Sequence, residues 1–496
     1  MKTYYTIISK ASVILLFLIG SLNATLTKAQ TGGATFEVGP TMMRGKIFPT
    51  STILDNGKII SFSGRETNFV SCAYSDLYNP VTNTFSEAAM NMPHDASATV
   101  KLSDGRFLLM GGGENLGIAP GFATTEMYNP TSGIFETKAS MTMGRMQHAG
   151  VQLANGKVLV VGAWYNTSGA TYGEVYDIGL DAYTATGAMN DPRAQPNVFP
   201  TTDGGAIITG GWPTYSGAVK TSVEYYSSAN NSFSLESSQL IPSDPEWIPM
   251  SINTRPMDDC KMNDGSYLMM AYRNVTTLEY ALLKFDPTTK LFTKINTLSP
   301  LVDDFTDGGF ADFVINKAAN IVYLIGFDAG FDPQQVSVVT VDITTGEVFH
   351  PNSTFTLPAQ EYFYAAYTFM PASGKIMVMG VNSSNSSYFN GTNKTYILTP
   401  QITIGTREFT KNSIDISCYP NPANNELNLK FNSKHTEKLS IDILDLTGQL
   451  ILQETKFTTK GIQTWGLNIG NIPNGYYFIR IVLAENSYTQ SFTIAR

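Results

Sequence analysis

The chain has few cysteines, and none of them is placed to build a site. Its 496 residues include three, Cys72, Cys260 and Cys418, which lie far apart and form no CxxC pair. Zinc sites and disulfide frameworks need closely spaced or paired cysteines, so neither is expected here. Isolated buried thiols are the commoner state of such residues. A single Cys72–Cys260 bridge remains an alternative.

The chain also lacks a block of positive charge. It carries 32 Lys and Arg against 41 Asp and Glu, a net charge of −9. Nucleic-acid binding relies on clustered Lys and Arg that neutralise phosphates, so a nucleic acid is not expected as a partner. The low charge, with 42 Gly and 25 Tyr, is typical of an all-β protein with many turns.

No apolar run is long enough to cross a bilayer, which takes about 20 residues. The longest, 11–22, follows Lys2 and Lys10 and precedes the small residues Thr27 and Ala29. This order is typical of an export signal cleaved before Gln30. We therefore expect residues 1–29 to be a signal peptide and expect no transmembrane segment.

Reaction motifs are also missing from the sequence. It contains no GxSxG, HExxH or P-loop pattern. We therefore assign no catalytic residue, no metal ligand and no cofactor from the sequence. Any function has to be inferred from the architecture and from where polar side chains recur in it.

A repeated pattern dominates the chain. It reads DGRFLLMGG at 104–112, NGKVLVVGA at 155–163 and DGGAIITGG at 203–211, each time followed by a later aromatic residue. A period near fifty residues with a turn, an apolar run and a Gly pair is typical of a β-propeller blade. The D-G and N-G pairs predict tight hairpins, because both central positions need a positive φ.

Following the pattern predicts seven blades and an all-β fold. The second strands are expected at Lys58–Gly64, Arg106–Gly112, Lys157–Gly162, Ala206–Gly211, Tyr267–Ala271, Ile321–Gly326 and Lys375–Gly380. The last three copies match the pattern less closely, and a six-bladed ring is the alternative. The seventh copy lacks an outer strand, and residues 34–45 resemble the segments that join other blades. We expect residues 35–38 to supply the missing strand, since ring closure removes an open edge.

These repeats resemble the kelch family, in the form of the galactose oxidase-like central domain. The resemblance rests on Met143-Gly144-Arg145, His148 and the Asn-Gly-Lys turn before VLVVG, and it covers residues 34 to about 404. It implies a propeller but no single function, because kelch rings serve as binding scaffolds and as enzyme frames. The copper oxidases among them need two His, two Tyr and a crosslinked Cys. The four His of this chain do not offer that set, so copper oxidation is not favoured.

A different pattern follows the repeats. After a linker at 405–414, alternating apolar runs at 415–496 predict a small antiparallel β-sandwich. The YPNPA opening at 419–423, the segment 441–449, the PNGYY motif at 473–477 and the final Arg closely resemble the type IX secretion system C-terminal sorting domain, type A.

That resemblance implies a Bacteroidota protein exported by Sec and then by the type IX machinery, which would bind residues 415–496. The product would be secreted or held at the outer cell surface, and in that family the tail is usually cleaved. The expected organisation is therefore a signal peptide (1–29), a propeller (30–404), a linker (405–414) and a sorting domain (415–496).

Candidate ligand-binding residues come from the joins between blades and from the loops after second strands, which open on one face of a propeller. Aligning the repeats gives the following candidates: Arg44, His94, Arg145, Arg193, Asp258, Asp259, Asp304 and Glu361 at joins, and Trp164 and Trp212 in loops. Arg and carboxylates bind hydroxyls or charged groups, and aromatic rings bind sugar faces, so this set suits a glycan. The alternatives are that the repeated Arg braces blades, that the Trp residues pack loops and that the acidic residues are solvated.

The sequence thus favours a secreted or surface-attached binding or adhesion module that holds a glycan or a protein on its loop face. The alternative is a glycan-active enzyme of epimerase or lyase type, with an Arg and a carboxylate at the channel mouth. If the Arg residues bind ligand, the double change Arg145→Ala with Arg193→Ala abolishes binding without unfolding the ring. Lost stability with unchanged binding would identify them as braces.

Overall fold

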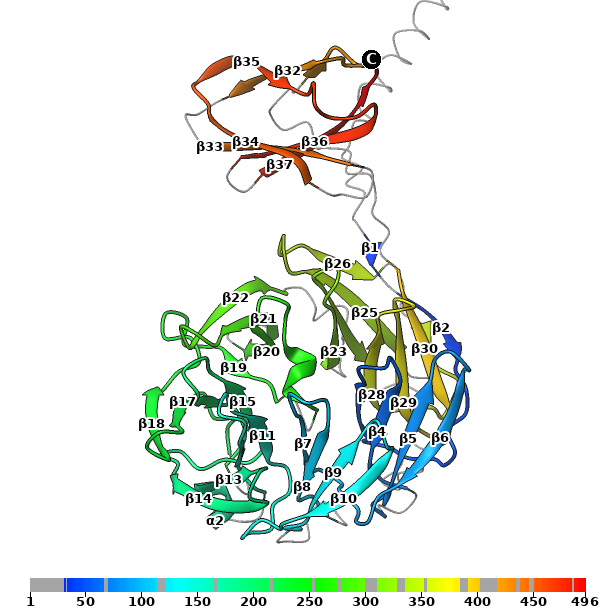
Figure 1. The fold of residues 1–496 in the computed structure, drawn as a ribbon, viewed down its shortest axis with the longest axis vertical. Coiled ribbons are helices and arrows are strands. Elements are labelled where there is room, and N and C mark those ends of the chain that lie inside the picture. The colour runs from blue at the N-terminus through cyan, green and yellow to red at the C-terminus, as the bar shows by residue number, and fades with distance from the viewer. Residues whose placement is uncertain are drawn as a thin grey trace, which may run out of the picture. The chain divides into compact units, whose positions relative to one another are not determined.

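The ring and the tail of the chain form two compact units, residues 30–404 and residues 405–496, in a computed structural model (Figure 1). The structure describes residues 31–496 except 33, 67–69, 114–120, 165–166, 214–216, 252–254, 275–277, 299–309, 328–334, 352–354, 384–390, 402–416, 434–437, 446–449 and 484–485. We describe each unit by itself.

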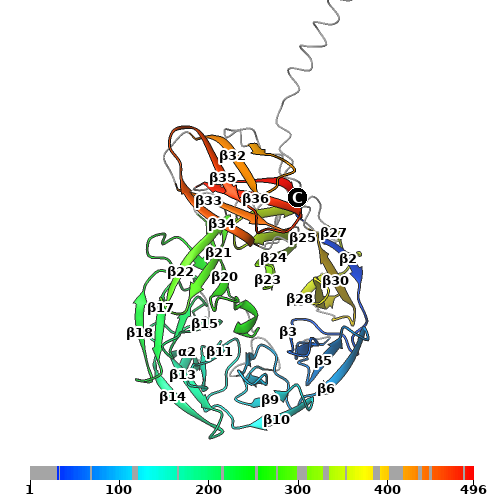
Figure 2. The same ribbon diagram turned by 45° about the horizontal axis from the view of Figure 1, so that its top comes forward.

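Seven sheets arranged around a central axis form the ring (Figures 1 and 2). Blade 1 contains β3 (Thr50–Ile53), β4 (Ile59–Phe62), β5 (Tyr74–Asn79) and β6 (Thr84–Ala89). Blade 2 contains β7 (Ala98–Lys101), β8 (Phe107–Met110), β9 (Thr125–Asn129) and β10 (Ile134–Lys138). Blade 3 contains β11 (Ala149–Gln152), β12 (Val158–Val161), the short helix α2 (Thr167–Thr171), β13 (Tyr172–Asp177) and β14 (Ala182–Ala188).

The other four blades repeat this order. Blade 4 contains β15 (Asn197–Pro200), β16 (Ala206–Thr209), β17 (Val223–Ser227) and β18 (Ser232–Ser237). Blade 5 contains β19 (Ile248–Pro249), β20 (Tyr267–Asn274), β21 (Leu278–Asp286) and β22 (Leu291–Thr297). Blade 6 contains β23 (Phe310–Asn316), β24 (Ile321–Phe327), β25 (Gln335–Asp342) and β26 (Val348–Pro351), with β27 (Phe355–Thr356) beside β25. Blade 7 contains β28 (Tyr362–Met370), β29 (Lys375–Asn382) and β30 (Thr395–Pro400).

The start of the described chain completes the ring. Strand β2 (Ala34–Val38) pairs antiparallel with β30 and is the outermost strand of blade 7. Two residues earlier, β1 (Thr31–Gly32) pairs with β26 of blade 6. This N-terminal segment therefore ties two blades together. The predicted all-β, seven-bladed ring is confirmed.

Apolar second strands and hairpin turns explain the blades. Strands β4, β8, β12 and β16 are buried along their whole length, because blades pack against them on both faces. Each hairpin before them turns through a Gly with positive φ, such as Gly105 (86°) and Gly156 (83°). Neighbouring blades share cores, as where Phe62 of blade 1 packs on Phe107 of blade 2 with ring centres 5.5 Å apart.

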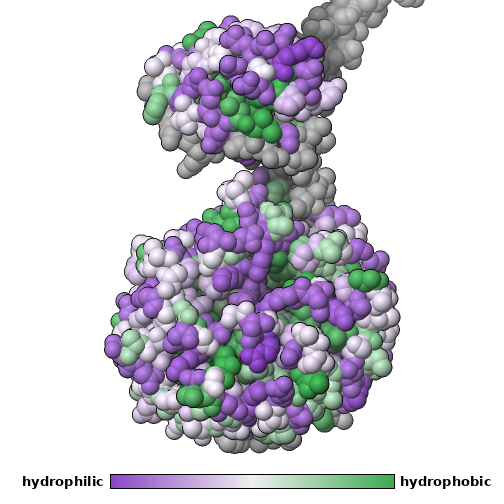
Figure 3. All heavy atoms as spheres, in the orientation of Figure 1, coloured by the Kyte–Doolittle hydropathy of each residue, from purple (hydrophilic) through white to green (hydrophobic). Residues whose placement is uncertain are grey.

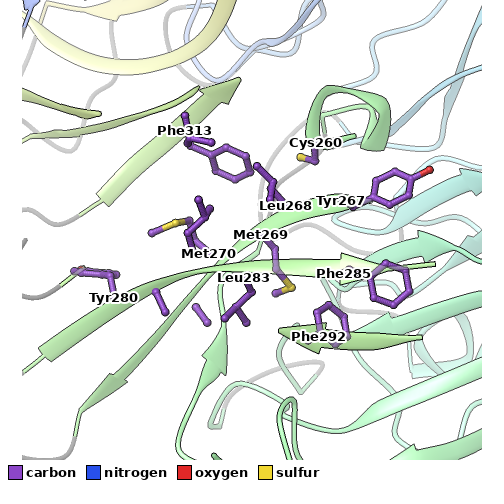
Figure 4. Close-up of a cluster of buried hydrophobic side chains, with 14 of the residues drawn as sticks. Cys260, Tyr267, Leu268, Met269, Met270, Tyr280, Leu283, Phe285, Phe292 and Phe313 are labelled. Atoms are coloured by element: carbon purple, nitrogen blue, oxygen red, sulfur yellow. The ribbon is translucent and has the colours of Figure 1, made fainter. Parts of the chain in front are cut away.

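Blade 5 departs from the repeat. Its first strand, β19, has two residues, and the chain then leaves the sheet to form the 3-10 helix η2 (Met257–Cys260) before joining β20. In both ribbon views this green helical turn lies inside the ring (Figures 1 and 2). Figure 4 shows Cys260 pointing from it toward the buried cluster that holds Leu268 and Phe313.

Two contacts tie η2 to distant blades. The Thr52 hydroxyl of blade 1 donates to Asp259 Oδ1 (2.8 Å), and Lys317 Nζ of blade 6 donates to the Asp258 carbonyl (2.9 Å). The helix therefore crosses the channel at the end where the blade hairpins turn. Cys72 and Cys260 are both free thiols, so the bridge left open by the sequence does not form.

The tail is a small β-sandwich. One sheet contains β31 (Ser417–Tyr419), β32 (Glu426–Ser433) and β35 (Gly461–Asn468). The other contains β34 (Leu450–Phe457), β33 (Lys438–Leu444), β36 (Gly475–Leu483) and β37 (Asn486–Ile494). Leu429, Ile441 and Ile479 belong to its single core. The sandwich predicted from the sequence is confirmed.

The last residue of the chain is held by the sandwich. Arg496 donates to the carbonyls of Ile472 (2.8 Å) and Ile469 (2.6 Å). Its Nε also donates to Asn425 Oδ1 (3.0 Å). Across the described part of the chain, no helix has the length and apolarity needed to cross a bilayer.

Candidate functional site

The repeated arginines of the joins are buried in ion pairs. Arg145 Nη2 lies 3.1 Å from Glu174 Oε1, and its Nη1 donates to the Gly162 carbonyl (3.1 Å). Arg193 repeats this arrangement with Glu224 (3.1 Å) and the Gly210 carbonyl (3.1 Å). Each Arg thereby ties the join to the second and third strands of the blade that follows.

Both guanidinium groups stay charged in this setting. Burial lowers the pKa of Arg145, and the Glu174 carboxylate opposes the shift; Glu224 opposes it in the same way for Arg193. An Arg pKa starts so high that such a shift leaves it protonated at neutral pH. With no exposed surface and guanidinium groups bonded to buried Glu174 and Glu224, these two residues have the geometry of the brace that the sequence left open.

Blades 1 and 2 carry variants of this brace. Lys46 Nζ lies 2.8 Å from Asp76 Oδ2, and His94 Nε2 lies 3.6 Å from Glu126 Oε2, all buried. The structure therefore places Lys46, rather than Arg44, at the position equivalent to Arg145. The sequence alignment slipped by two residues here because both residues are cationic and flank Gly45.

Arg44 lies on the surface instead. Its side chain is 55% exposed, pairs with Glu87 (2.8 Å) and stacks over the Tyr74 ring, 4.5 Å from the ring centre. It does not line the channel. The sequence provided no way to separate Arg44 from Lys46, since only burial distinguishes them.

The acidic candidates do not come together on one face. Glu361 lies at the join of blade 7, buried, and pairs with Lys394 and the Tyr396 hydroxyl. Asp258 and Asp259 lie on η2, at the hairpin end of the channel rather than at the joins, and burial raises the pKa of Asp259 to about 6. Asp304 lies outside the described residues. Glu361 therefore lies at the join end of the channel and Asp258 and Asp259 at the hairpin end.

A cavity of about 330 Å³ opens where the joins meet the channel. We call it the join-face cup. Its lining comes from the joins of blades 1–4, with contributions from blades 5 and 7: Phe48, Pro49, Arg65, Asp95, Ala96, Gln147, His148, Gln195, Pro196, Ser251 and Ala365. None of the predicted candidates is among them.

The charges that line the cup cancel. Arg65 Nε lies 2.5 Å from Asp95 Oδ2, and the two side chains are buried against each other. Burial raises the pKa of Asp95, although Arg65 opposes that shift. His148 is buried, and burial together with the nearby Arg145 guanidinium lowers its pKa to about 3, so it is neutral at neutral pH. The cup therefore has no net charge.

Four lining residues share one unusual backbone conformation. Phe48, Ala96, Gln147 and Gln195 have φ values of 51°, 55°, 50° and 51°. Each follows its brace residue by two positions, so the brace holds the strained residue at the channel. A positive φ costs a non-Gly residue about 1–2 kcal/mol, and such strain persists where the surroundings over-determine it, often at ligand sites.

These four residues supply the exposed chemistry of the cup. Phe48 is 39% exposed, and the Arg65 guanidinium lies over one face of its ring, 5.2 Å from the ring centre. The carboxamides of Gln147 and Gln195, both half-buried, make no hydrogen bond within the described part of the chain. An aromatic face and two free amides can bind hydroxyl-bearing rings.

The two predicted tryptophans lie beside the same joins. Trp212 pairs with Ala194, next to Gln195, and its side chain is 38% exposed. The backbone N–H of Trp164 donates to the Met146 carbonyl (2.9 Å), next to Gln147. Arg65 occupies the equivalent position opposite Ile47. Both tryptophans are thus at the edge of the cup face, as the join-and-loop argument expected, although neither lines the cavity.

Sequence reasoning missed the lining residues because it followed the recurring residue type. The residues two positions after each brace are Phe, Ala, Gln and Gln, which share no chemistry. The variation of residue type at this position, two residues after each brace, could have marked it. A position with a structural role tends to keep the same residue in each blade, whereas a position that contacts a ligand can differ.

Comparisons with known proteins bear on the two units separately. Residues 417–495 match the family model of the secretion system C-terminal sorting domain. Among solved structures, the fold is similar to a fungal alcohol oxidase described as having catalytic diversity among the AA5 family, in complex with copper. That match has a TM-score of 0.50 and 14% identity, and covers 94% of this chain and 99% of the other. No curated protein sequence is significantly similar to the chain.

The residues of the cup do not fit a copper centre. Among the described residues, no three His, Cys, Asp or Glu side chains gather closely enough to hold a metal ion. The single His of the cup is buried beside Arg145, whose positive charge disfavours a cation there. At 14% identity the likeness to the oxidase shows the shared fold and carries no activity to this chain.

Proposed function

Because this chain is a kelch propeller followed by a secretion system C-terminal sorting domain, which directs it to the outside of the cell, we propose that the propeller is an extracellular binding module whose join-face cup holds a neutral sugar. The observation that carries the proposal is the cancelled charge of a cup lined by an aromatic ring and two free carboxamides. An anionic sugar would need an unpaired cation, and the Arg65 guanidinium already binds Asp95.

The size of the cup agrees with this ligand class. Its 330 Å³ lies at the lower end of ligand pockets, which span about 300–1,000 Å³, and suits one or two sugar rings. Phe48 offers a ring face for the C–H side of a sugar, and Gln147 and Gln195 offer both donors and acceptors for hydroxyls. Figure 3 shows one face of the ring, on which hydrophilic and hydrophobic residues are interspersed.

A glycan array probed with residues 30–496 tests the proposal. We expect binding to neutral glycans and none that depends on sialic or uronic acid groups. Gln147→Gly and Gln195→Gly should each weaken binding about two- to tenfold, the effect of losing a hydrogen bond or two. Hits confined to acidic glycans, or silence across the array, would overturn the proposal.

The backbone provides a matched control. Gly tolerates the positive φ of these positions, so the two Gln→Gly variants should keep their thermal stability to within about 1 kcal/mol. Ala96→Gly makes the same backbone change at the equivalent position of blade 2 without removing a polar side chain. It should leave glycan binding unchanged.

A second candidate is a glycan-active enzyme of epimerase or lyase type. One observation favours it: Arg65 and Asp95 lie 2.5 Å apart and line the same cup as His148, so an Arg, a carboxylate and a His share one site. If Asp95 moves protons, bound sugar should be converted over hours, as followed by proton NMR, and Asp95→Asn should stop conversion. Unchanged sugar would leave binding as the function.

The organisation of the export signals is also a proposal. Residues 1–29 would be removed on export, residues 30–404 would carry the binding function, and residues 415–496 would engage the type IX machinery. Mass spectrometry of the exported protein should find Gln30 at the N-terminus. Deleting residues 415–496 should trap the protein in the periplasm.

A further inference from the structure

A second cavity, about 600 Å³ in volume, opens at the opposite end of the channel, between the hairpin turns of blades 2–4 and the diverted segment of blade 5. We call it the turn-face pocket. The helix η2 separates it from a smaller cavity of about 380 Å³ on the side of blades 6 and 7. Asp258 lines the larger cavity and Asp259 the smaller, so the two carboxyl groups of η2 face different spaces.

The pocket forms where the first strand of blade 5 is shorter than the first strands of blades 1–4. In blades 1–4 the first strand has four residues that pair along the second strand. Among the described residues of blade 5, the first strand is limited to Ile248 and Pro249, and residues 257–260 form η2 instead of a strand. Departures from an otherwise regular repeat are expected where function overrides packing.

Most charges around the pocket already have partners. Lys101 Nζ lies 2.6 Å from Asp55, and Lys284 Nζ lies 2.6 Å from Asp264. Asp286 accepts hydrogen bonds from the backbone N–H groups of the turn that follows it, starting with Thr288 (2.8 Å). These groups have internal partners, although Asp286 keeps its negative charge because backbone N–H groups do not neutralise it.

Two side chains of opposite charge, the half-buried Asp258 and the exposed Lys261, have no such partner among the described residues. Within the described part of the chain, neither the Asp258 carboxylate nor the Lys261 ammonium has an ion pair or a side-chain hydrogen bond. They flank the end of η2, where the Lys261 N–H donates to the Asp258 carbonyl (3.2 Å). The ammonium lies 5.7 Å from the centre of the Tyr267 ring, which lines the same pocket. The negative charge of Asp258 adds to burial in raising the pKa of Tyr267.

We propose that the turn-face pocket binds a zwitterionic ligand of the amino-acid or short-peptide class. Lys261 pairs with the ligand carboxylate, and Asp258 pairs with its ammonium. A purely anionic ligand would leave Asp258 opposing it, and a neutral sugar would leave both charges unpaired. The pocket volume lies within the range of ligand sites of about 300–1,000 Å³. The proposal does not depend on the join-face cup.

Calorimetric titration of residues 30–496 tests this with defined probes: a panel of free tripeptides, the same tripeptides acetylated and amidated at their ends, and maltose. We expect at least one free tripeptide to bind and its capped form to bind at least tenfold more weakly, because charge-assisted bonds are about twice as strong as neutral ones. If no free tripeptide binds, or if capping changes nothing, the proposal is wrong.

Variants locate the site. Asp258→Asn and Lys261→Met should each weaken binding of the free tripeptide about tenfold or more, with little change in thermal stability, since neither side chain has an internal ion pair or side-chain hydrogen bond. Lys157→Met, on the same face but outside the pocket, is the matched control and should bind normally. Unchanged affinity in both pocket variants would overturn the assignment. Sugar binding at the cup should be the same in all three variants, so the two proposals fail separately.

Discussion

Blades 1–4 hold their joins with different groups from blades 5 and 7. In the first four, a buried cation of the join meets a carboxylate on the third strand: Lys46 with Asp76, His94 with Glu126, Arg145 with Glu174 and Arg193 with Glu224. In blade 7 the polarity is inverted, because the join supplies Glu361 and the third-strand region supplies Lys394 and Tyr396. In blade 5 the join contains the buried Trp247, whose Nε1 donates to Asp244 (2.8 Å).

This difference explains which blades form the cup. Each of the four braced joins places one residue with positive φ at the channel, whereas the joins of blades 5 and 7 contribute only Ser251 and Ala365 to the cup. A buried ion pair is weak evidence for stability but can fix a conformation. The comparison indicates that the brace positions its neighbour, and the neighbour meets the ligand.

The largest expected effect tests the brace itself. Arg145→Met leaves the Glu174 carboxylate buried without its cation, which should destabilise the ring by about 3–5 kcal/mol. Denaturant unfolding measures this. The exposed Arg44→Met is the control and should change stability by less than about 1 kcal/mol, as for surface ion pairs. If Arg145→Met keeps full stability but loses sugar binding, Arg145 contacts the ligand and is not a brace.

A smaller effect is expected at the closure of blade 7. Phe36 of β2 stacks on Phe355 with ring centres 4.6 Å apart and lies 5.6 Å from Tyr396. Phe36→Ala should cost about 2 kcal/mol through lost apolar burial. The neighbouring Val38, which is 68% exposed, provides the control Val38→Ala. Equal effects from the two changes would show that the closing strand is held by its backbone alone.

The pH dependence of stability should reveal His148, which is buried next to the brace of blade 3. Its pKa falls from 6.5 to about 3 in the folded ring, so the unfolded chain binds one more proton between these pH values. The stabilisation is complete above pH 6.5 and decreases as the pH falls toward 3, by at most about 1.4 kcal/mol per pH unit. Comparing unfolding of the parent and His148→Asn at pH 4 and 7 isolates this contribution. Identical slopes would contradict it.

The smallest effect sharpens the comparison within the braced group. His94 approaches Glu126 only to 3.6 Å, and neither His94 Nε2 nor Glu126 Oε2 has a hydrogen bond in the described residues. His94→Arg restores the guanidinium of blades 3 and 4 and should stabilise the ring by about 1 kcal/mol, the worth of one hydrogen bond. Thermal unfolding checks this. A loss of stability would show that blade 2 is packed around the smaller imidazole.

The candidate site was only partly open to prediction. The face of the ring that carries the cup could be inferred from the sequence, because Trp164 and Trp212 lie beside the joins. The residues that line the cup could not be inferred. Arg145 and the nearby Gln147 differ in burial, and a repeat pattern shows which residues recur but not which way each side chain points. Asp258 was misplaced for a related reason: the diversion of blade 5 leaves the apolar second strand intact, so nothing in the pattern marks it.

The sequence by itself determined the ring and the C-terminal sorting domain, because turn residues, apolar periodicity and short motifs act locally and remain recognisable in the weaker copies of the repeat. Only the tertiary structure decided which polar groups pair with one another. Arg145 and Glu174 lie 29 residues apart and meet within blade 3, whereas Thr52 and Asp259 lie 207 residues apart and meet only because the ring brings blades 1 and 5 together. The groups left over after that pairing, Gln147 and Gln195 at one end of the channel and Asp258 and Lys261 at the other, are the ones available to a ligand.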